Sequence, residues 1–145
     1  MDMSPLSDRD RQTLREMFRD LKYPVHLQLF VEDGNQGSDN AKVLVREVVR
    51  VMPDLLRLDV FERSRDSLLA ALYGVWEVPT LILCDQKRED SGIRFIGLPS
   101  GYEFAALIEA LLDVSQNRIR LSEKSLNFIR NVEDDIILDV FVAPT

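Results

Sequence analysis

The stretch that decides the fold is Val75-Trp76-Glu77-Val78-Pro79-Thr80-Leu81-Ile82-Leu83-Cys84. Its last four residues are all apolar, which is typical of a strand that is buried on both faces of a sheet. We expect the bond between Val78 and Pro79 to be cis, which would leave the Val78 backbone free to pair with an extended peptide. The alternative is a proline that only begins the strand.

The residues that follow this strand predict a hairpin and then a helix. Residues 85–91 are polar and turn-like, so a strand from Gly92 to Ile96 would run antiparallel to the buried strand. A tight connection follows, Gly97-Leu98-Pro99-Ser100-Gly101. The segment 102–113 then has apolar residues at helical spacing, namely Phe104, Leu107, Ile108, Leu111 and Leu112.

The residues before the buried strand begin with a helix. Ser7 and Asp10 form a capping-box pattern, with Asp in place of Glu, ahead of apolar residues at helical spacing. Pro24 ends this helix, and residues 25–31 then form a strand. After a polar loop, either Ser38 or Asp39 is placed to cap the next helix.

A second strand and a short helix complete the pattern. Pro53 stops the preceding helix, residues 55–61 form the strand, and residues 67–73 form a helix with Gly74 at its C′ position. Two strands joined by a helix predict a right-handed βαβ unit, and the hairpin adds two antiparallel strands. We therefore expect an α/β fold, a four-stranded mixed sheet with helices on both faces. This is the thioredoxin architecture.

The chain also repeats the pattern of its own beginning. Leu6-Ser7 opens a helix that leads into the first strand, and Leu121-Ser122 opens a helix that leads into residues 136–142. At one constant offset, Leu27, Leu29, Phe30 and Val31 match Leu138, Val140, Phe141 and Val142. We expect a complete domain over residues 1–115. Residues 116–145 would then hold a linker, a helix at 122–130 and the first strand of a truncated second repeat.

The strand expected at residues 136–142 is apolar on both faces. Four side chains point one way and two the other, namely Ile136, Leu138, Val140 and Val142 against Ile137 and Phe141. An exposed apolar strand tends to pair with another chain. We therefore expect a homodimer in which residues 136–142 are paired or swapped across a two-fold axis.

Composition and charge limit the partners and the compartment. Acidic residues outnumber Lys plus Arg by 25 to 18, and the net charge of −7 argues against binding to nucleic acid. No apolar run approaches the ~20 residues of a membrane helix, and Met1-Asp2-Met3-Ser4-Pro5 has no feature of a signal peptide. Cys84 is the only cysteine, so no internal disulfide forms. These features indicate a cytoplasmic protein with no membrane contact.

Several residues that often mark a reactive site are better explained by structural roles. His26, the only histidine, has no carboxylate or thiol at ligand spacing. Glu133-Asp134-Asp135 is typical of a solvated turn, and Gly34-Asn35-Gln36-Gly37 lacks the Lys-Ser/Thr of a phosphate loop. Cys84 ends an apolar strand and precedes Asp85, so a buried and inert thiol is expected. We therefore expect no metal and no cofactor.

Two segments resemble those of thioredoxin-fold proteins. Val78-Pro79-Thr80 resembles their cis-proline motif, and Trp76 beside it belongs either to the core or to a surface patch near the active-site face. The segment 97–104, Gly-Leu-Pro-Ser-Gly-Tyr-Glu-Phe, is similar to one in the two-repeat, glutaredoxin-like protein disulfide oxidoreductases. It also resembles a segment in the N-terminal domain of the alkyl hydroperoxide reductase flavoprotein. This resemblance covers nearly the whole chain. It implies that Ala143-Pro144-Thr145 stands just before the Cys-x-x-Cys of a second repeat.

The first repeat departs from the redox pattern of that family. The resemblance puts its motif at Asn35-Gln36-Gly37-Ser38, or at Gln36-Gly37-Ser38-Asp39 if the register shifts by one. Neither window contains a cysteine. Disulfide exchange needs a thiolate and a second thiol that resolves the mixed disulfide. The helix N-terminus that would lower a thiol pKa is present, but the sulfur is not.

We therefore expect a redox-inactive thioredoxin-like domain with no catalytic residue of its own. The resemblance implies the N-terminal scaffold of a disulfide oxidoreductase that serves redox homeostasis and has its Cys-x-x-Cys beyond Thr145. The alternative is a stand-alone protein-interaction or assembly module without catalysis. Trp76, Val78, Pro79 and Thr80 are the candidate residues for binding a peptide or protein substrate.

Overall fold

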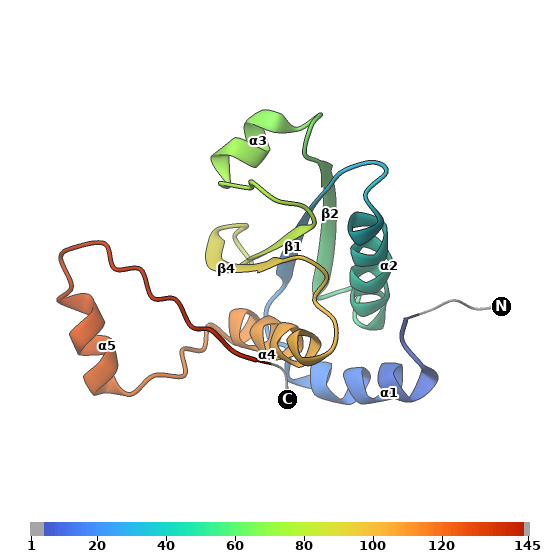
Figure 1. Cartoon of the computed structure of the whole chain (residues 1–145). Helices are drawn as coiled ribbons and strands as arrows, with labels where there is room; N and C mark the ends of the chain where they lie inside the picture. The colour runs from blue at the N-terminus through green and yellow to red at the C-terminus, as the bar shows by residue number, and fades with distance from the viewer. Residues whose placement is uncertain (1–4, 144–145) are drawn as a thin grey trace.

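A computed structural model describes residues 5–143, so the predictions for Met1–Ser4 and for Pro144–Thr145 lie outside the described residues. Figure 1 shows the elements, which follow in the order α1 (Asp8–Met17), the 3-10 helix η1 (Phe18–Asp20), β1 (Val25–Val31), α2 (Gln36–Val51), β2 (Leu56–Glu62), α3 (Ser67–Leu72), β3 (Thr80–Cys84), β4 (Asp90–Ile96), α4 (Tyr102–Gln116) and α5 (Glu123–Arg130). No helix within residues 5–143 is long and apolar enough to cross a membrane.

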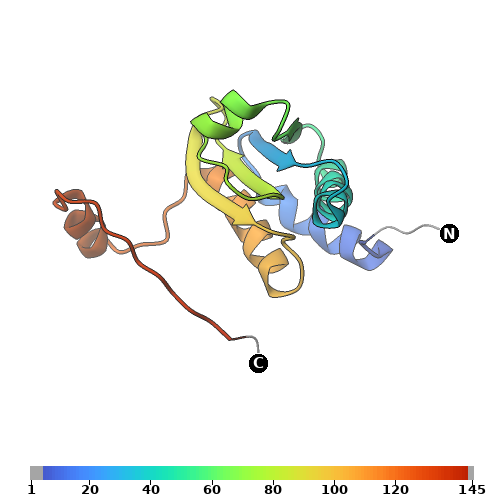
Figure 2. The same ribbon diagram turned by 45° about the horizontal axis from the view of Figure 1, so that its top comes forward.

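The four strands form one mixed sheet in the order β2-β1-β3-β4. β1 is parallel to β2, and β3 is antiparallel to both β1 and β4. Figure 2 shows α3 on one side of the sheet and α1 and α4 on the other. The α/β fold predicted from the sequence, a four-stranded mixed sheet with helices on both faces, is thus confirmed.

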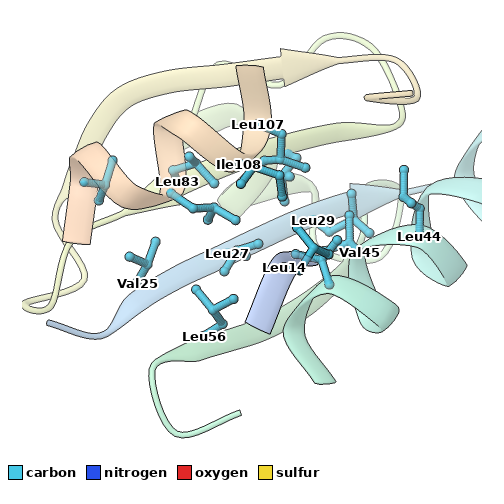
Figure 3. Packing of buried hydrophobic residues seen from close by; sticks show 14 of the residues in the cluster. Leu14, Val25, Leu27, Leu29, Leu44, Val45, Leu56, Leu83, Leu107 and Ile108 are labelled. Atoms are coloured by element: carbon cyan, nitrogen blue, oxygen red, sulfur yellow. The ribbon is translucent and has the colours of Figure 1, made fainter. Parts of the chain in front are cut away.

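The central strand β1 lies in the middle of the core, and all seven of its residues are buried. Leu27 and Leu29 belong to the larger cluster, which packs beneath α1, α2 and α4 (Figure 3). Phe30 faces the opposite way and packs with Phe61 and Ala70 in a smaller cluster beneath α3. Burying one such Leu or Phe side chain contributes about 1.5–3 kcal/mol. The larger cluster is therefore the main source of stability.

The first helix begins as its sequence predicts. The Asp10 N–H donates to Ser7 Oγ at 3.1 Å, and the Ser7 N–H donates to Asp10 Oδ2 at 2.9 Å. These two reciprocal bonds complete the capping box of α1. Gly74 follows α3 with φ +63°, a left-handed conformation that glycine adopts at the end of a helix without strain.

The start of α2 differs from the sequence prediction. Neither Ser38 nor Asp39 caps this helix; Asn35 does, because its Oδ1 accepts the Ser38 N–H at 2.8 Å. The Ser38 hydroxyl is fully buried and accepts the Glu32 N–H at 3.1 Å. Since that oxygen is bonded to the end of β1, it is not available as a cap, and the helix starts earlier.

Ser115 ties the end of α4 to the connection between η1 and β1. Its side chain is fully buried. Its Oγ accepts the Lys22 N–H at 2.9 Å and the Tyr23 N–H at 3.0 Å, and it donates to the Tyr23 carbonyl at 2.7 Å. One hydroxyl thus satisfies three backbone groups that are more than 90 residues away in sequence.

The C-terminal segment corrects one prediction. The helix expected at residues 122–130 forms as α5, and the Ser122 side chain accepts the Ser125 N–H at 3.2 Å. The strand expected at residues 136–142 does not form, because no partner strand lies beside it in the described chain. Its apolar side chains are 62–93% exposed. A strand needs a neighbour to satisfy its backbone groups, and residues 136–142 have none here.

Candidate functional site

The loop that enters α2 lies against the segment that enters β3. The Val78–Pro79 peptide bond is cis in the structure. A Cβ added at Gly37 would lie 3.4 Å from Pro79 Cδ and 3.2 Å from Asn35 Oδ1. The residues at the degenerate dithiol position, 35–39, and the proline therefore meet at one edge of the sheet. Only a small residue fits at position 37 without moving these neighbours.

Two residues of this loop lie in positions that suit a pair of cysteines. Asn35 is half-buried at the N-cap of α2, where it accepts the Ser38 N–H. Ser38 lies one turn later and is fully buried. The N-terminus of a helix stabilises negative charge, which is why a thiol at such a position becomes a thiolate readily. Here an amide and a hydroxyl occupy these two positions.

The remaining candidates of this loop are simple surface residues. Gln36 and Asp39 are both exposed. The Gln36 side chain donates to Asn40 Oδ1 at 3.1 Å, and Asp39 forms an ion pair with Lys42 at 2.8 Å. Both are contacts between neighbouring turns of α2, so they support the helix and define no site.

The segment before β3 presents backbone and an aromatic side chain to solvent. Among the described residues, the Val78 N–H and C=O form no hydrogen bond. Trp76 is 79% exposed, so of the two roles expected for it the surface role is the one observed. Pro79 and Thr80 are buried, and Thr80 Oγ1 donates to the Glu77 carbonyl at 2.7 Å. This bond holds the turn that displays Val78.

Arg63, which the sequence analysis did not single out, connects the two halves of the site. Its Nη1 donates to the Trp76 carbonyl at 2.7 Å, and its Nε lies 3.2 Å from Glu32 Oε2. A hydrogen bond from the Ser64 hydroxyl, together with Arg63, holds the pKa of Glu32 below its usual value. Glu32 therefore keeps its charge, and the ion pair fixes the Trp76 loop beside the end of β1.

The one thiol of the chain is remote from this loop and unreactive. Cys84 is fully buried at the end of β3. Burial, with the nearby carboxylates of Asp90 and Asp85, raises its pKa to about 11. A thiolate is the reactive form, so Cys84 stays inert near neutral pH.

His26 is no catalytic partner for Ser38. It is the second residue of β1, whereas the loop follows the last, so about 16 Å of strand separates them. Burial, with Arg88 and Arg57 nearby, lowers the pKa of His26. Within residues 5–143, no three His, Cys, Asp or Glu side chains form a group that could hold a metal ion.

Comparison with known proteins agrees with this geometry. No family model matches the chain. AhpF, the flavoprotein of alkyl hydroperoxide reductase, from Staphylococcus aureus (strain MRSA252) is 26% identical over 133 residues, which cover 87% of this chain and 24% of that protein. The chain thus spans about a quarter of the length of the curated relatives it matches.

Solved structures give the same answer for the fold. A mutant of AhpF from Enterococcus faecalis (V583) matches with a TM-score of 0.78 and 24% identity, over 86% of this chain and 59% of that one. A protein disulfide oxidoreductase from Aeropyrum pernix K1 matches with a TM-score of 0.77 and 24% identity, over 86% and 54%. These matches confirm the resemblance drawn from the motifs: the chain has the thioredoxin fold and is similar to the N-terminal domain of AhpF and to a protein disulfide oxidoreductase.

Proposed function

We propose that this thioredoxin-like domain does not exchange disulfides and serves as the scaffold of a disulfide oxidoreductase. One observation carries the proposal: Asn35 and Ser38 occupy the N-cap and the buried inner position of α2 opposite Pro79. Exchange requires a thiolate that attacks a disulfide sulfur and a second thiol that resolves the product. An amide and a hydroxyl do neither.

The burial pattern favours one register of the degenerate motif. In the window Asn35–Ser38, the first residue caps the helix and the last points inward. In the window Gln36–Asp39, both end residues are exposed. A dithiol needs its two sulfurs within bonding distance of each other. We therefore assign the lost pair to positions 35 and 38.

The catalytic dithiol would lie in a second unit. Support comes from the size of the relatives, since the chain covers 59% of the Enterococcus structure and 54% of the Aeropyrum one. The family resemblance puts this Cys-x-x-Cys directly after Ala143-Pro144-Thr145. Reading the natural gene beyond codon 145 tests this. A Cys-x-x-Cys within a few codons is expected, and its absence would favour a stand-alone interaction module.

The surface at Trp76 and Val78 would support the substrate. Free backbone groups at Val78 suit an extended peptide, and the exposed Trp76 ring adds apolar contact beside them. A cytoplasmic location belongs to the same proposal, supported by the single free thiol. Titration with an extended apolar peptide, followed by NMR, should shift the amide signals of residues 76–80. W76A should weaken this binding, and an unchanged spectrum would refute the substrate role.

Insulin reduction by dithiothreitol, followed as turbidity, tests the lack of activity. The chain should give the same rate as its C84S variant, because Cys84 is buried and its pKa is raised. A faster rate for the unaltered chain would overturn the proposal.

Restoring the sulfurs provides the converse test. The triple variant N35C/S38C/C84S should form one intramolecular disulfide and accelerate insulin reduction. The control N35C/C84S has one thiol that cannot resolve a mixed disulfide, and it should not. If the triple variant folds but forms no disulfide, positions 35 and 38 are not the lost dithiol.

A further inference from the structure

The most exposed apolar segment of the molecule is residues 136–142, here called the arm. Ile137, Phe141 and Val142 are 87%, 93% and 85% exposed. No backbone group of residues 133–143 forms a hydrogen bond with another described residue. The arm therefore has both unsatisfied backbone groups and an uncovered apolar surface, and a sheet edge would satisfy both.

The β4 edge of the arm's own sheet is a poor acceptor for a parallel strand. β4 runs parallel to β1, because each is antiparallel to β3. The crossover from β1 through α2 to β2 is right-handed by rule, and α2 and α4 pack in the same cluster on one face. A crossover from β4 through α4 to a strand outside β4 would run the opposite way. It would be left-handed, which sheets avoid in nearly all cases.

The linker directs the arm away from the other edge of its own sheet. Arg118 and Arg120 both bind Asp113 near the end of α4, at 2.6 and 2.8 Å, and Arg120 also reaches Glu109 at 3.5 Å. Figures 1 and 2 both show α5 and the arm on the side of β4, with β2 on the far side of the sheet. The edge strand β2 of the same chain is therefore badly placed to receive the arm.

Of the two edges, β2 is the better template for a new strand. All seven of its residues pair with β1 in unbroken register, so its outer side is regular. β4 has a bulge opposite Ile82 and Cys84, and its Gly92 has φ +82°. Bulges protect an edge from further pairing, and β2 has none in this register.

The side chains of the arm match the β2 edge. Leu58-Asp59-Val60-Phe61 in β2 and Leu138-Asp139-Val140-Phe141 in the arm are identical, so the arm has a pattern that this sheet already accepts at its edge. With Asp139 beside Arg57, the apolar residues of both strands share the face toward α2. Arg57 is exposed and, among the described residues, pairs with no carboxylate. The charges of arm and edge are thus complementary.

We propose that the arm of one 145-residue chain adds as a strand to the β2 edge of a second copy, with Asp139 beside Arg57. By two-fold symmetry the second copy returns its own arm to the first. Each arm then gains backbone hydrogen bonds and covers its apolar side chains. Two such contacts form one closed dimer, and neither depends on the degenerate dithiol or on a substrate.

Sedimentation velocity over a concentration series, with charge-reversal variants, tests this pairing. R57E and D139R should each raise the dimer dissociation constant about tenfold, because each puts like charges side by side at both contacts. R57E/D139R restores opposite charges and should recover dimerisation. R46E, on the exposed face of α2, is the control for R57E, and D134R is the control for D139R. A chain that ends at Val132 should be monomeric.

Other outcomes would overturn the proposal. Weakening by D139R but not by R57E would mean that the arms pair with each other or with another edge. A full-length chain that stays monomeric into the high micromolar range would show that the arm folds onto its own domain. Failure of R57E/D139R to recover the dimer, although both single variants weaken it, would exclude the pairing of Arg57 with Asp139.

Discussion

Replacing Ser115 with alanine should cost far more stability than the size of the change suggests. The hydroxyl is fully buried and makes three bonds, with the Lys22 and Tyr23 N–H groups and with the Tyr23 carbonyl. A net hydrogen bond is worth about 1 kcal/mol, and leaving its backbone partner unsatisfied costs more. S115A should therefore lose about 3 kcal/mol of unfolding free energy.

Urea unfolding followed by far-UV circular dichroism measures this loss. The midpoint should fall with little change in slope, because S115A keeps the same core. In a thermal scan the same loss corresponds to a Tm lower by about 10 °C. Ser67 is exposed at the first turn of α3, so S67A serves as the control and should stay within about 0.5 kcal/mol. A loss below about 1 kcal/mol for S115A would refute the reasoning, since water would then be replacing the hydroxyl.

Three further predictions concern the helix cap, the linker and the Trp76 loop. N35A should destabilise the domain by about 1 kcal/mol in urea, because α2 loses its cap, whereas N35D keeps an acceptor and should not. Burial opposes the charge of Asp113, but bonds from Arg118 and Arg120 outweigh it and lower its pKa. Its contribution is present above pH 3.8 and lost as pH falls through the lowered pKa, so in acid titrations the stability difference between the chain and D113N should shrink below pH 3.8. R63A should change the free energy of unfolding by less than about 1 kcal/mol, yet amide exchange at residues 75–78 should accelerate, because the bond to the Trp76 carbonyl is lost; unchanged exchange would contradict the bridging role.

The sequence predicted the sheet well because its strands differ in how they are covered. Leu81 to Cys84 are buried on both faces, so an unbroken apolar run marks them. Alternation marks β2, where Leu56 is buried and Arg57 exposed. The two fixed connections, a crossover helix and a short hairpin, then leave few topologies.

Contacts between residues distant in sequence escaped prediction. Arg63 belongs to a turn with no pattern of its own, and only the folded chain brings it to Glu32 and to the Trp76 carbonyl. The cap of α2 was assigned to Ser38 or Asp39 because their residue types suit that role. The hydroxyl of Ser38 is bonded to the Glu32 N–H instead, which a local pattern does not reveal. The strand at 136–142 was predicted from its apolar residues, but a strand also needs a neighbour.

The burial of Cys84 makes the chain convenient for probes that attach to thiols. Reagents such as maleimides and nitroxide spin labels react with exposed thiolates, and this sulfur is neither exposed nor ionised near neutral pH. One cysteine introduced on the surface would therefore take up label alone, with the native sequence otherwise unaltered. Distances between a probe on the arm and one on a partner's sheet could then be measured in the folded protein.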